Sequence, residues 1–199
     1  MDSKVKEAII KVANDYGIEP AALLAVKLVE TGNNNGFLDS GEPQILFEGH
    51  VFYKYYKNTV PASTLSSKMK VYPNIIYPKW DKSKYLGGIK EHSRLQQATR
   101  INREFALMST SWGLFQIMGF NWKLCGCKSL QEFINMNYKD LDSQVKLGVE
   151  FLINSKLVDK LKELDWAGFA KKYNGSGYAK NAYDQKLMNA YNNFKRALS

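Results

Sequence analysis

The segment Pro20-Ala-Ala-Leu-Leu-Ala-Val-Lys-Leu-Val-Glu-Thr-Gly32 carries the strongest structural signal in the chain. Every residue from Ala21 to Val29 is apolar except Lys27. Proline is favoured in the first turn of a helix, and glycine is favoured just beyond its end. The segment therefore predicts a mostly buried helix whose last turn carries Glu30.

The position of Glu30 has a chemical consequence. Burial disfavours the ionised form of a carboxyl group, and so does the negative end of a helix dipole, so the pKa of Glu30 is expected to be raised. A carboxyl group that stays protonated near neutral pH can protonate the leaving oxygen of a glycosidic bond. The alternative is a surface glutamate that merely ends a helix.

Helices are predicted along most of the remaining chain, with one irregular β-hairpin. The hairpin is expected between Asn33 and Phe47, where turn-forming residues flank short apolar pieces. Residues 71–90 are expected to form a long loop or very short helices. Predicted helices are Ser3–Tyr16, Glu48–Lys57, Glu91–Met108, a short apolar one at Ser111–Met118, one opened by the capping box Ser129-Leu-Gln-Glu132, and segments near 140–154, 157–163, 165–173 and 178–196.

Composition favours one compact domain over residues 1–199, mainly α with a small β-hairpin. The chain has 199 residues, of which 45% are hydrophobic, enough for a substantial core. No apolar run approaches the roughly 20 residues that span a bilayer, so no stable membrane insertion is expected. The N-terminus lacks the features of a signal peptide, which predicts a protein held in the cytoplasm until something else releases it.

Charge is distributed unevenly along the sequence. The net charge is +9, but residues 1–50 carry four basic and eight acidic side chains. Residues 51–104 carry eleven basic and three acidic side chains. A basic surface beside an acidic segment that bears Glu30 predicts an anionic polymer as the partner, and both nucleic acid and the bacterial cell wall qualify.

Neither a metal nor a cofactor is expected. The two cysteines, Cys125 and Cys127, form a C-x-C pair without a nearby histidine, which is not a zinc motif. A disulfide across one residue would be strained, so free thiols are the better interpretation. The two histidines, His50 and His92, are too few and too scattered for a metal site.

Three motifs stand in order: Glu30-Thr-Gly32, Ser111-Trp-Gly-Leu-Phe-Gln-Ile-Met118 and Lys172-Tyr-Asn-Gly175. Together they resemble the lysozyme-like superfamily, especially goose-type lysozymes and lytic transglycosylases. Those enzymes carry a catalytic Glu at a helix end, a Gly-Leu-Met-Gln element and a Tyr-Asn element. The resemblance implies an α+β lysozyme-like fold, in which a helical domain holds a small β-hairpin beside the active-site cleft.

A closer resemblance is to the phage endolysin group of N-acetylmuramidases, over about residues 20–195. It is carried by Pro43-Gln-Ile-Leu-Phe-Glu-Gly-His-Val-Phe52, by Ser111-Trp-Gly-Leu-Phe-Gln-Ile-Met-Gly-Phe-Asn121, by Trp166-Ala-Gly-Phe-Ala-Lys-Lys-Tyr-Asn-Gly-Ser-Gly-Tyr178 and by Tyr183-Asp-Gln-Lys-Leu187.

This second resemblance implies scission of the β-1,4 bond after N-acetylmuramic acid in peptidoglycan glycan strands, used for bacterial cell lysis. It also implies a catalytic role for Glu30. The chain is expected to lack a separate wall-binding domain, so wall affinity would come from its positive charge. A holin is the expected route of release from the host cytoplasm, and the protein is expected to be a monomer.

Two residues compete for the role of second carboxylate. Glu48 belongs to the Leu-Phe-Glu-Gly-His stretch that best fits the endolysin group, and it follows an apolar strand. Asp39 lies nine residues after Glu30, a spacing similar to that of T4-type phage lysozymes. Those enzymes continue with a threonine six residues on, where this chain has Ile45. Glu48 is preferred narrowly, with a helix N-terminal glutamate and a turn-forming aspartate as the respective alternatives.

The resemblance implies four substrate-binding residues. Gln116 would line the cleft and contact sugar or position Glu30, or it would simply bond to backbone. Tyr173 and Asn174 match the Tyr-Asn element, in which the tyrosine hydroxyl approaches the catalytic Glu; a core tyrosine would look the same. His50 would either line the cleft or satisfy a backbone carbonyl.

Three other functions remain open at this point. A lytic transglycosylase would cleave the same bond without water and would need only one catalytic Glu. A nucleic-acid-binding protein would explain the net charge of +9, but no recognisable binding motif is present. An inactive wall-binding module would leave the Glu30 motif unexplained.

Overall fold

The computed structural model describes the backbone of residues 1–199 and the side chains of all but Asn174, Ser176, Gly177 and Lys180. Its helices are α1 (Ser3–Asp15), α2 (Pro20–Thr31), α3 (Gly49–Tyr56), α4 (Ala62–Val71), α5 (Ile89–Thr99), α6 (Arg103–Met108), α7 (Leu130–Lys139), α8 (Leu141–Asn154), α9 (Val158–Lys162), α10 (Trp166–Asn174) and α11 (Tyr183–Leu198). The strands are β1 (Ile45–Phe47), β2 (Thr110–Trp112) and β3 (Ile117–Met118), and 3-10 turns lie at Lys82–Lys84, Gly119–Asn121 and Ser176–Asn181.

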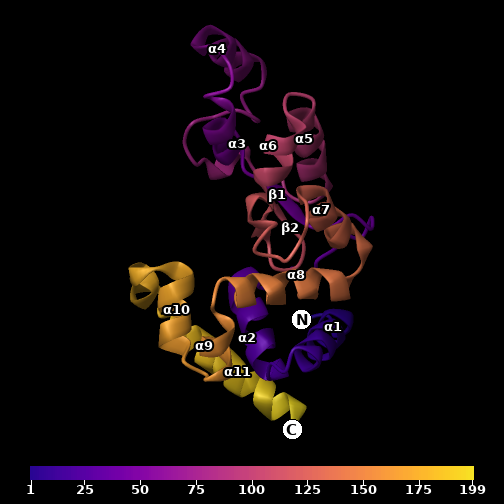
Figure 1. The fold of residues 1–199 in the computed structure, drawn as a ribbon, viewed down its shortest axis with the longest axis vertical. Coiled ribbons are helices and arrows are strands. Elements are labelled where there is room, and N and C mark those ends of the chain that lie inside the picture. Colours follow the sequence, from indigo (N-terminus) through magenta and orange to yellow (C-terminus); the bar gives the residue numbers. More distant parts are fainter.

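These elements form two lobes that meet at α8 (Figure 1). One lobe contains α1, α2 and α9–α11, and the other contains the sheet and α3–α7. Each lobe has its own apolar core. Val145 and Val149 of α8 belong to the first core, whereas Leu147 belongs to the second. Phe115 and Phe151 pack against both cores, so the two lobes are joined by continuous apolar packing around α8.

The helix that carries Glu30 forms as predicted. α2 begins at Pro20 and ends before Gly32, whose φ of 55° only glycine adopts readily. All side chains from Ala21 to Lys27 are buried, because α2 packs against α1 and α11. The helix is therefore the centre of its lobe, as its composition indicated.

The sheet is antiparallel with strand order β1-β2-β3. In β1, Ile45 pairs with Trp112 and Phe47 pairs with Thr110 of β2. The predicted hairpin of residues 33–47 is present only as an isolated bridge between Phe37 and Pro43, and β1 pairs with the distant β2 instead. The mainly α fold with a small β element is confirmed.

One predicted helix is in fact a β-hairpin. Residues 111–118 were expected to be helical, but they form β2, a tight turn and β3. Gly113 and Gln116 have φ values of 67° and 50°, which a right-handed helix does not permit. Pairing with β1 supplies the backbone hydrogen bonds that a helix would otherwise supply, so long-range contact decides the structure here.

A second correction concerns residues 91–108, which form two helices and not one. Asn102 separates α5 from α6 because its side chain accepts a hydrogen bond from the Phe105 N–H at 3.0 Å, as an N-cap. No element was predicted at α4, in which Leu65 and Met69 are only partly buried against the core. The helix predicted near residues 178–196 begins only at Tyr183, after the 3-10 turn Ser176–Asn181. The other predicted helices are present with small shifts at their ends, including α7, whose cap Ser129 accepts from the Glu132 N–H.

Candidate active site

Glu30 lies on the last turn of α2, half-buried at the end of the buried helix. Burial raises its pKa to about 7, and a weaker interaction with the Tyr173 hydroxyl opposes this shift. Its Oε1 atom is buried and meets no hydrogen-bond partner among the described side chains. A carboxyl group in this setting keeps its proton up to neutral pH, as a general acid must.

The chain immediately around Glu30 is held by short polar contacts. The buried Lys27 donates from Nζ to the Gly32 carbonyl at 2.7 Å, and the Thr31 hydroxyl donates to the Lys27 carbonyl at 3.1 Å. Asn34 donates to the Gly113 and Leu114 carbonyls at 2.9 and 3.2 Å. The segment that follows α2 is thereby tied to the β2–β3 turn.

Tyr173 of α10 is the described side chain that the structure brings to Glu30. It stacks on Phe169 with ring centroids 5.7 Å apart. Burial and the neighbouring Glu30 both raise its pKa, so the phenol stays neutral. The predicted neighbour Asn174 lies outside the described side chains.

Glu48 sits between β1 and α3, where its backbone N–H donates to the Ser109 carbonyl at 2.9 Å. Its side chain is only 16% exposed. The Tyr85 hydroxyl donates a hydrogen bond to Oε2, and Nδ1 of His50 lies 3.3 Å from the same oxygen. Glu48 and His50, both predicted from sequence, are therefore neighbours.

Asp39 occupies a different environment. It lies at the exposed tip of the turn closed by the Phe37–Pro43 bridge, where the Leu38 N–H donates to the Glu42 carbonyl at 2.8 Å. This is the turn-forming environment that was its alternative interpretation.

Gln116 is held inside the β2–β3 turn. Its Nε2 donates to the Gln44 and Gly113 carbonyls at 3.1 and 2.9 Å, and its Oε1 accepts from the Ser111 hydroxyl at 2.9 Å. The amide is therefore fully engaged by the protein itself. These bonds stabilise the turn to which Asn34, four residues after Glu30, is also attached.

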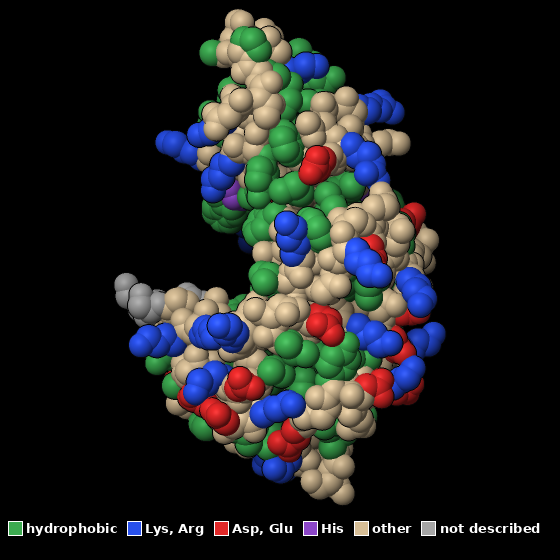
Figure 2. Space-filling model, in the orientation of Figure 1, with side chains coloured by type: hydrophobic (Ala, Val, Ile, Leu, Met, Phe, Trp, Pro, Cys, Tyr) green, Lys and Arg blue, Asp and Glu red, His purple; other side chains and the backbone are tan. Residues whose placement is uncertain are grey.

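The two acidic groups stand on different lobes. Glu30 and Tyr173 belong to the lobe of α2 and α10, whereas Glu48 and His50 belong to the lobe of the sheet and α3. Figure 2 shows a deep hollow between these lobes, on the side away from α1. One protonated carboxyl group and a second carboxylate on facing lobes are the groups that glycoside hydrolysis uses.

Sequence reasoning did not assign the partners of Glu48. As an aromatic residue of the predicted 71–90 loop, Tyr85 is expected either to stack on a sugar ring or to pack on its own domain, and the sequence indicates no role for Tyr77, Glu91 or Arg94. Glu91 and Arg94 are buried on α5, more than 40 residues from Glu48 in sequence. An acidic and a basic residue three apart on a helix is ordinarily a surface pair, so no local signal distinguishes them.

Other observations limit the kind of site. Cys125 and Cys127 are buried free thiols whose pKa values burial raises. Within the described part of the chain, no three His, Cys, Asp or Glu side chains gather as metal ligands would. No helix described here has the length and apolarity that crossing a bilayer requires.

Comparison with known proteins agrees with this geometry. Residues 19–195 match the muramidase family, described as N-acetylmuramidase. The structure is similar to the crystal structure of the Burkholderia AP3 phage endolysin, with a TM-score of 0.79 and 34% sequence identity, covering 98% of this chain and 71% of that one. No curated protein sequence matches significantly. The chain thus belongs to the N-acetylmuramidase family and is a peptidoglycan hydrolase of the endolysin type.

Proposed function

We propose that this enzyme cleaves the β-1,4 bond between N-acetylmuramic acid and N-acetylglucosamine with Glu30 as the general acid. The observation that carries the proposal is the Glu30 carboxyl group, whose pKa is about 7 and whose Oε1 is buried without a partner. A glycan strand in the hollow between the lobes would offer its glycosidic oxygen to this group. Transfer of the proton lets the leaving sugar depart as an alcohol.

Glu48 is proposed as the second carboxylate, in preference to Asp39. Its low exposure and the hydrogen bond from Tyr85 support a fixed orientation, whereas Asp39 is exposed at a turn. A fixed carboxylate there would stabilise the positive charge that develops on the sugar ring or would activate the attacking water. The stereochemistry of the product, followed by NMR, distinguishes these two roles.

His50, Gln116, Tyr173 and Asn174 remain proposed substrate-binding residues. The positions of His50 beside Glu48 and of Tyr173 beside Glu30 support direct contact with sugar. The internal hydrogen bonds of Gln116 are those of its alternative interpretation, a bond to backbone, and they stabilise the turn to which Asn34 is attached.

The comparisons do not favour the lytic transglycosylase alternative. The two reactions differ by one water in the product, because a transglycosylase forms a 1,6-anhydro sugar. Mass spectrometry of the released muropeptides is expected to show the hydrated product. The nucleic-acid-binding alternative has no support beyond charge, and a gel-shift assay at physiological salt is expected to show no complex.

We also propose that the chain works as one catalytic unit, a monomer that binds the wall through its own basic surface. Its natural setting would be cell lysis, with the enzyme held in the host cytoplasm until a holin gives it access to peptidoglycan. The net charge of +9 and the similarity to a phage endolysin support this setting.

The decisive experiment compares three variants on chloroform-treated cells and on purified peptidoglycan. Glu30→Gln is expected to lose at least ~10²-fold in rate, because general acid catalysis typically contributes ~10²–10⁴-fold. Glu48→Gln is expected to lose at least ~10²-fold with little change in wall binding, and Asp39→Asn is expected to be mild. If Asp39→Asn lost more activity than Glu48→Gln, the role of second carboxylate would move to Asp39. If Asp39→Asn and Glu48→Gln both stayed active, Glu30 would work alone.

A further inference from the structure

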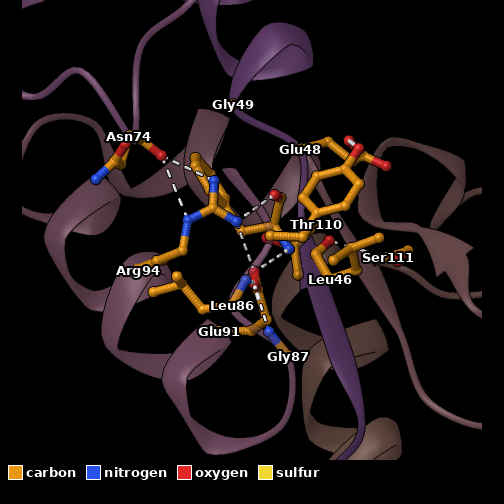
Figure 3. Close-up of polar contacts among 12 residues, drawn as sticks. Leu46, Glu48, Gly49, Asn74, Leu86, Gly87, Glu91, Arg94, Thr110 and Ser111 are labelled. Atoms are coloured by element: carbon orange, nitrogen blue, oxygen red, sulfur yellow. Dashed lines mark hydrogen bonds and ion pairs between the residues drawn. The ribbon is translucent and has the colours of Figure 1, made fainter. Parts of the chain in front are cut away.

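Two charged side chains of α5 are fully buried beside β1. Glu91 and Arg94 are 0% and 2% exposed, and Arg94 Nη1 lies 2.7 Å from Glu91 Oε2 (Figure 3). Burying two charges is costly unless their remaining donors and acceptors are also satisfied. The partners that satisfy them here converge on the residues around Glu48.

The first partner is Phe47, the residue immediately before Glu48. Its N–H donates to Glu91 Oε2 at 3.1 Å, and its carbonyl accepts from Arg94 Nη1 at 3.0 Å. β1 is an edge strand, so the outward N–H and C=O of Phe47 have no neighbouring strand. The ion pair takes the place of that strand and holds the backbone there.

The second partner is Tyr77, which holds the residue immediately after Glu48. Arg94 Nη2 donates to the Tyr77 hydroxyl at 3.3 Å, and the Gly49 N–H donates to the same oxygen at 3.2 Å. A Cβ on Gly49 would lie 2.3 Å from Tyr77 Cε1, so this contact requires glycine at position 49. The backbone is therefore fixed on both sides of Glu48.

The third set of contacts reaches the Tyr85 loop. Glu91 Oε1 accepts from the Leu86 and Gly87 N–H groups at 2.6 and 3.2 Å, directly after Tyr85. Tyr85 in turn donates from its hydroxyl to the Glu48 carboxylate. Arg94 completes its bonds by donating from Nε and Nη2 to the Asn74 carbonyl at 3.3 and 2.8 Å.

We propose that Glu91 and Arg94 are positioning residues that hold Glu48 in its working orientation, an inference that rests on the proposed role of Glu48. The pair holds residue 47 directly, residue 49 through Tyr77, and the Tyr85 loop through Glu91. Displacement of a reacting group by about 1 Å can cost ~10²-fold in rate.

The test uses Arg94→Lys, which keeps the positive charge but loses the planar fork that reaches Phe47, Asn74 and Tyr77 together. Steady-state rates are measured on soluble glycan strands stripped of peptide, at a temperature where unfolding curves show the variant folded. We expect kcat to fall at least ~10-fold with KM within about 2-fold, since the loss concerns a catalytic orientation and not substrate binding.

A milder variant, Tyr77→Phe, removes one hydroxyl and leaves the ion pair intact, so it serves if Arg94→Lys does not fold. We expect kcat to fall roughly 3- to 10-fold. Tyr16→Phe is the matched control, because it also removes one hydrogen-bonded tyrosine hydroxyl, which here lies at the end of α1 in the other lobe and donates to Glu150 Oε1 at 2.9 Å. It is expected to keep full kcat.

The Glu48→Gln background separates positioning from general stability. If the α5 pair acts through Glu48, adding Arg94→Lys or Tyr77→Phe to Glu48→Gln should cost less than about 2-fold more. Two outcomes would overturn the positioning role alone. In one, the double variants lose as much additional kcat as the single variants lose from wild type. In the other, Arg94→Lys and Tyr77→Phe both keep wild-type kcat although Glu48→Gln is inactive. An active Glu48→Gln enzyme would instead overturn the proposed role of Glu48 and the positioning inference with it.

Discussion

At the scale of single residues, the central fact is that Glu30 combines burial with an unpaired oxygen. Burial raises its pKa to about 7, although the Tyr173 hydroxyl acts in the opposite direction. A hydrogen-bonded, solvated carboxyl group would ionise far below neutral pH and could not act as an acid there. The environment of Glu30 therefore matters as much as its identity.

The pH dependence of kcat should report this environment. Glu30 must be protonated to act, so kcat is expected to fall about tenfold per pH unit once the pH exceeds about 7. Rates on soluble glycan strands between pH 5 and 9 provide the measurement. An alkaline limb that stays flat to pH 9 would show that a different group donates the proton.

The same residue should lower the stability of the fold at high pH. The pKa of Glu30 rises from 4.5 to about 7 on folding, so the folded state binds more protons between these values. The contribution of Glu30 to the free energy of unfolding is then most favourable below pH 4.5, falls as the pH rises to 7, and stays lower above it. Glu30→Gln is expected to gain up to about 3 kcal/mol over wild type above pH 7, and nothing below pH 4.5.

Chemical denaturation of both proteins at pH 4 and pH 8 checks this expectation. An equal difference at the two pH values would show that the gain does not come from ionisation of Glu30. Loss of activity in a variant of higher stability would also exclude unfolding as the reason for inactivity.

At the scale of elements, the β2–β3 turn connects the site to α7 and α8. Gly113 in this turn has a φ of 67°, and a Cβ there would lie 2.2 Å from Asn137 Oδ1. Asn137 and Gln144 are both buried, and Gln144 Oε1 accepts from the Leu114 N–H at 2.8 Å. A larger residue would therefore disturb a satisfied polar network.

Gly113→Ala is expected to destabilise the fold by roughly 2–5 kcal/mol, from overpacking of about 1–3 and a left-handed backbone cost of about 1–2. Gly41→Ala is the matched control. Gly41 also has a positive φ, 94°, but a Cβ there would meet no atom within 4 Å. Gly41→Ala should therefore show the backbone cost alone. If urea denaturation gave the same loss of unfolding free energy for Gly41→Ala and Gly113→Ala, the packing argument would be wrong.

At the scale of the whole molecule, a group of lysines carries positive charge on the lobe of the sheet and α3–α7. Lys79, Lys82 and Lys90 are exposed in or beside the long loop before α5, and Lys84 is half-buried there. An anionic polymer held by such a surface is bound through interactions that salt screens, so binding and activity should fall as salt rises.

Replacing these four lysines with glutamine is expected to weaken wall binding and to flatten the salt dependence of lysis. The matched control replaces four exposed lysines elsewhere, Lys4, Lys128, Lys139 and Lys186. The control has the same net charge as the test variant, so a difference between them reports location and not charge alone. The same salt profile in both variants would rule out the loop as the contact surface.

The sequence by itself determined the features that depend on local pattern. The run of apolar residues between Pro20 and Gly32 was sufficient to predict α2, its burial and the raised pKa of Glu30. Three short motifs indicated the lysozyme-like superfamily, and four longer stretches indicated the N-acetylmuramidase family. These signals are readable because propensity, capping and burial act on neighbouring residues.

Only the tertiary structure decided the features that depend on residues far apart in the chain. Residues 111–118 look like an apolar helix, but pairing with residues 45–47 makes them strands. Likewise, Glu91 and Arg94 look like a surface pair until α5 packs against the edge of β1. Water would satisfy such charges at a surface, whereas inside the protein they must bond to whatever the fold brings near. Here that includes the backbone of Phe47, directly before Glu48, and the hydroxyl of Tyr77, which binds the Gly49 N–H directly after it.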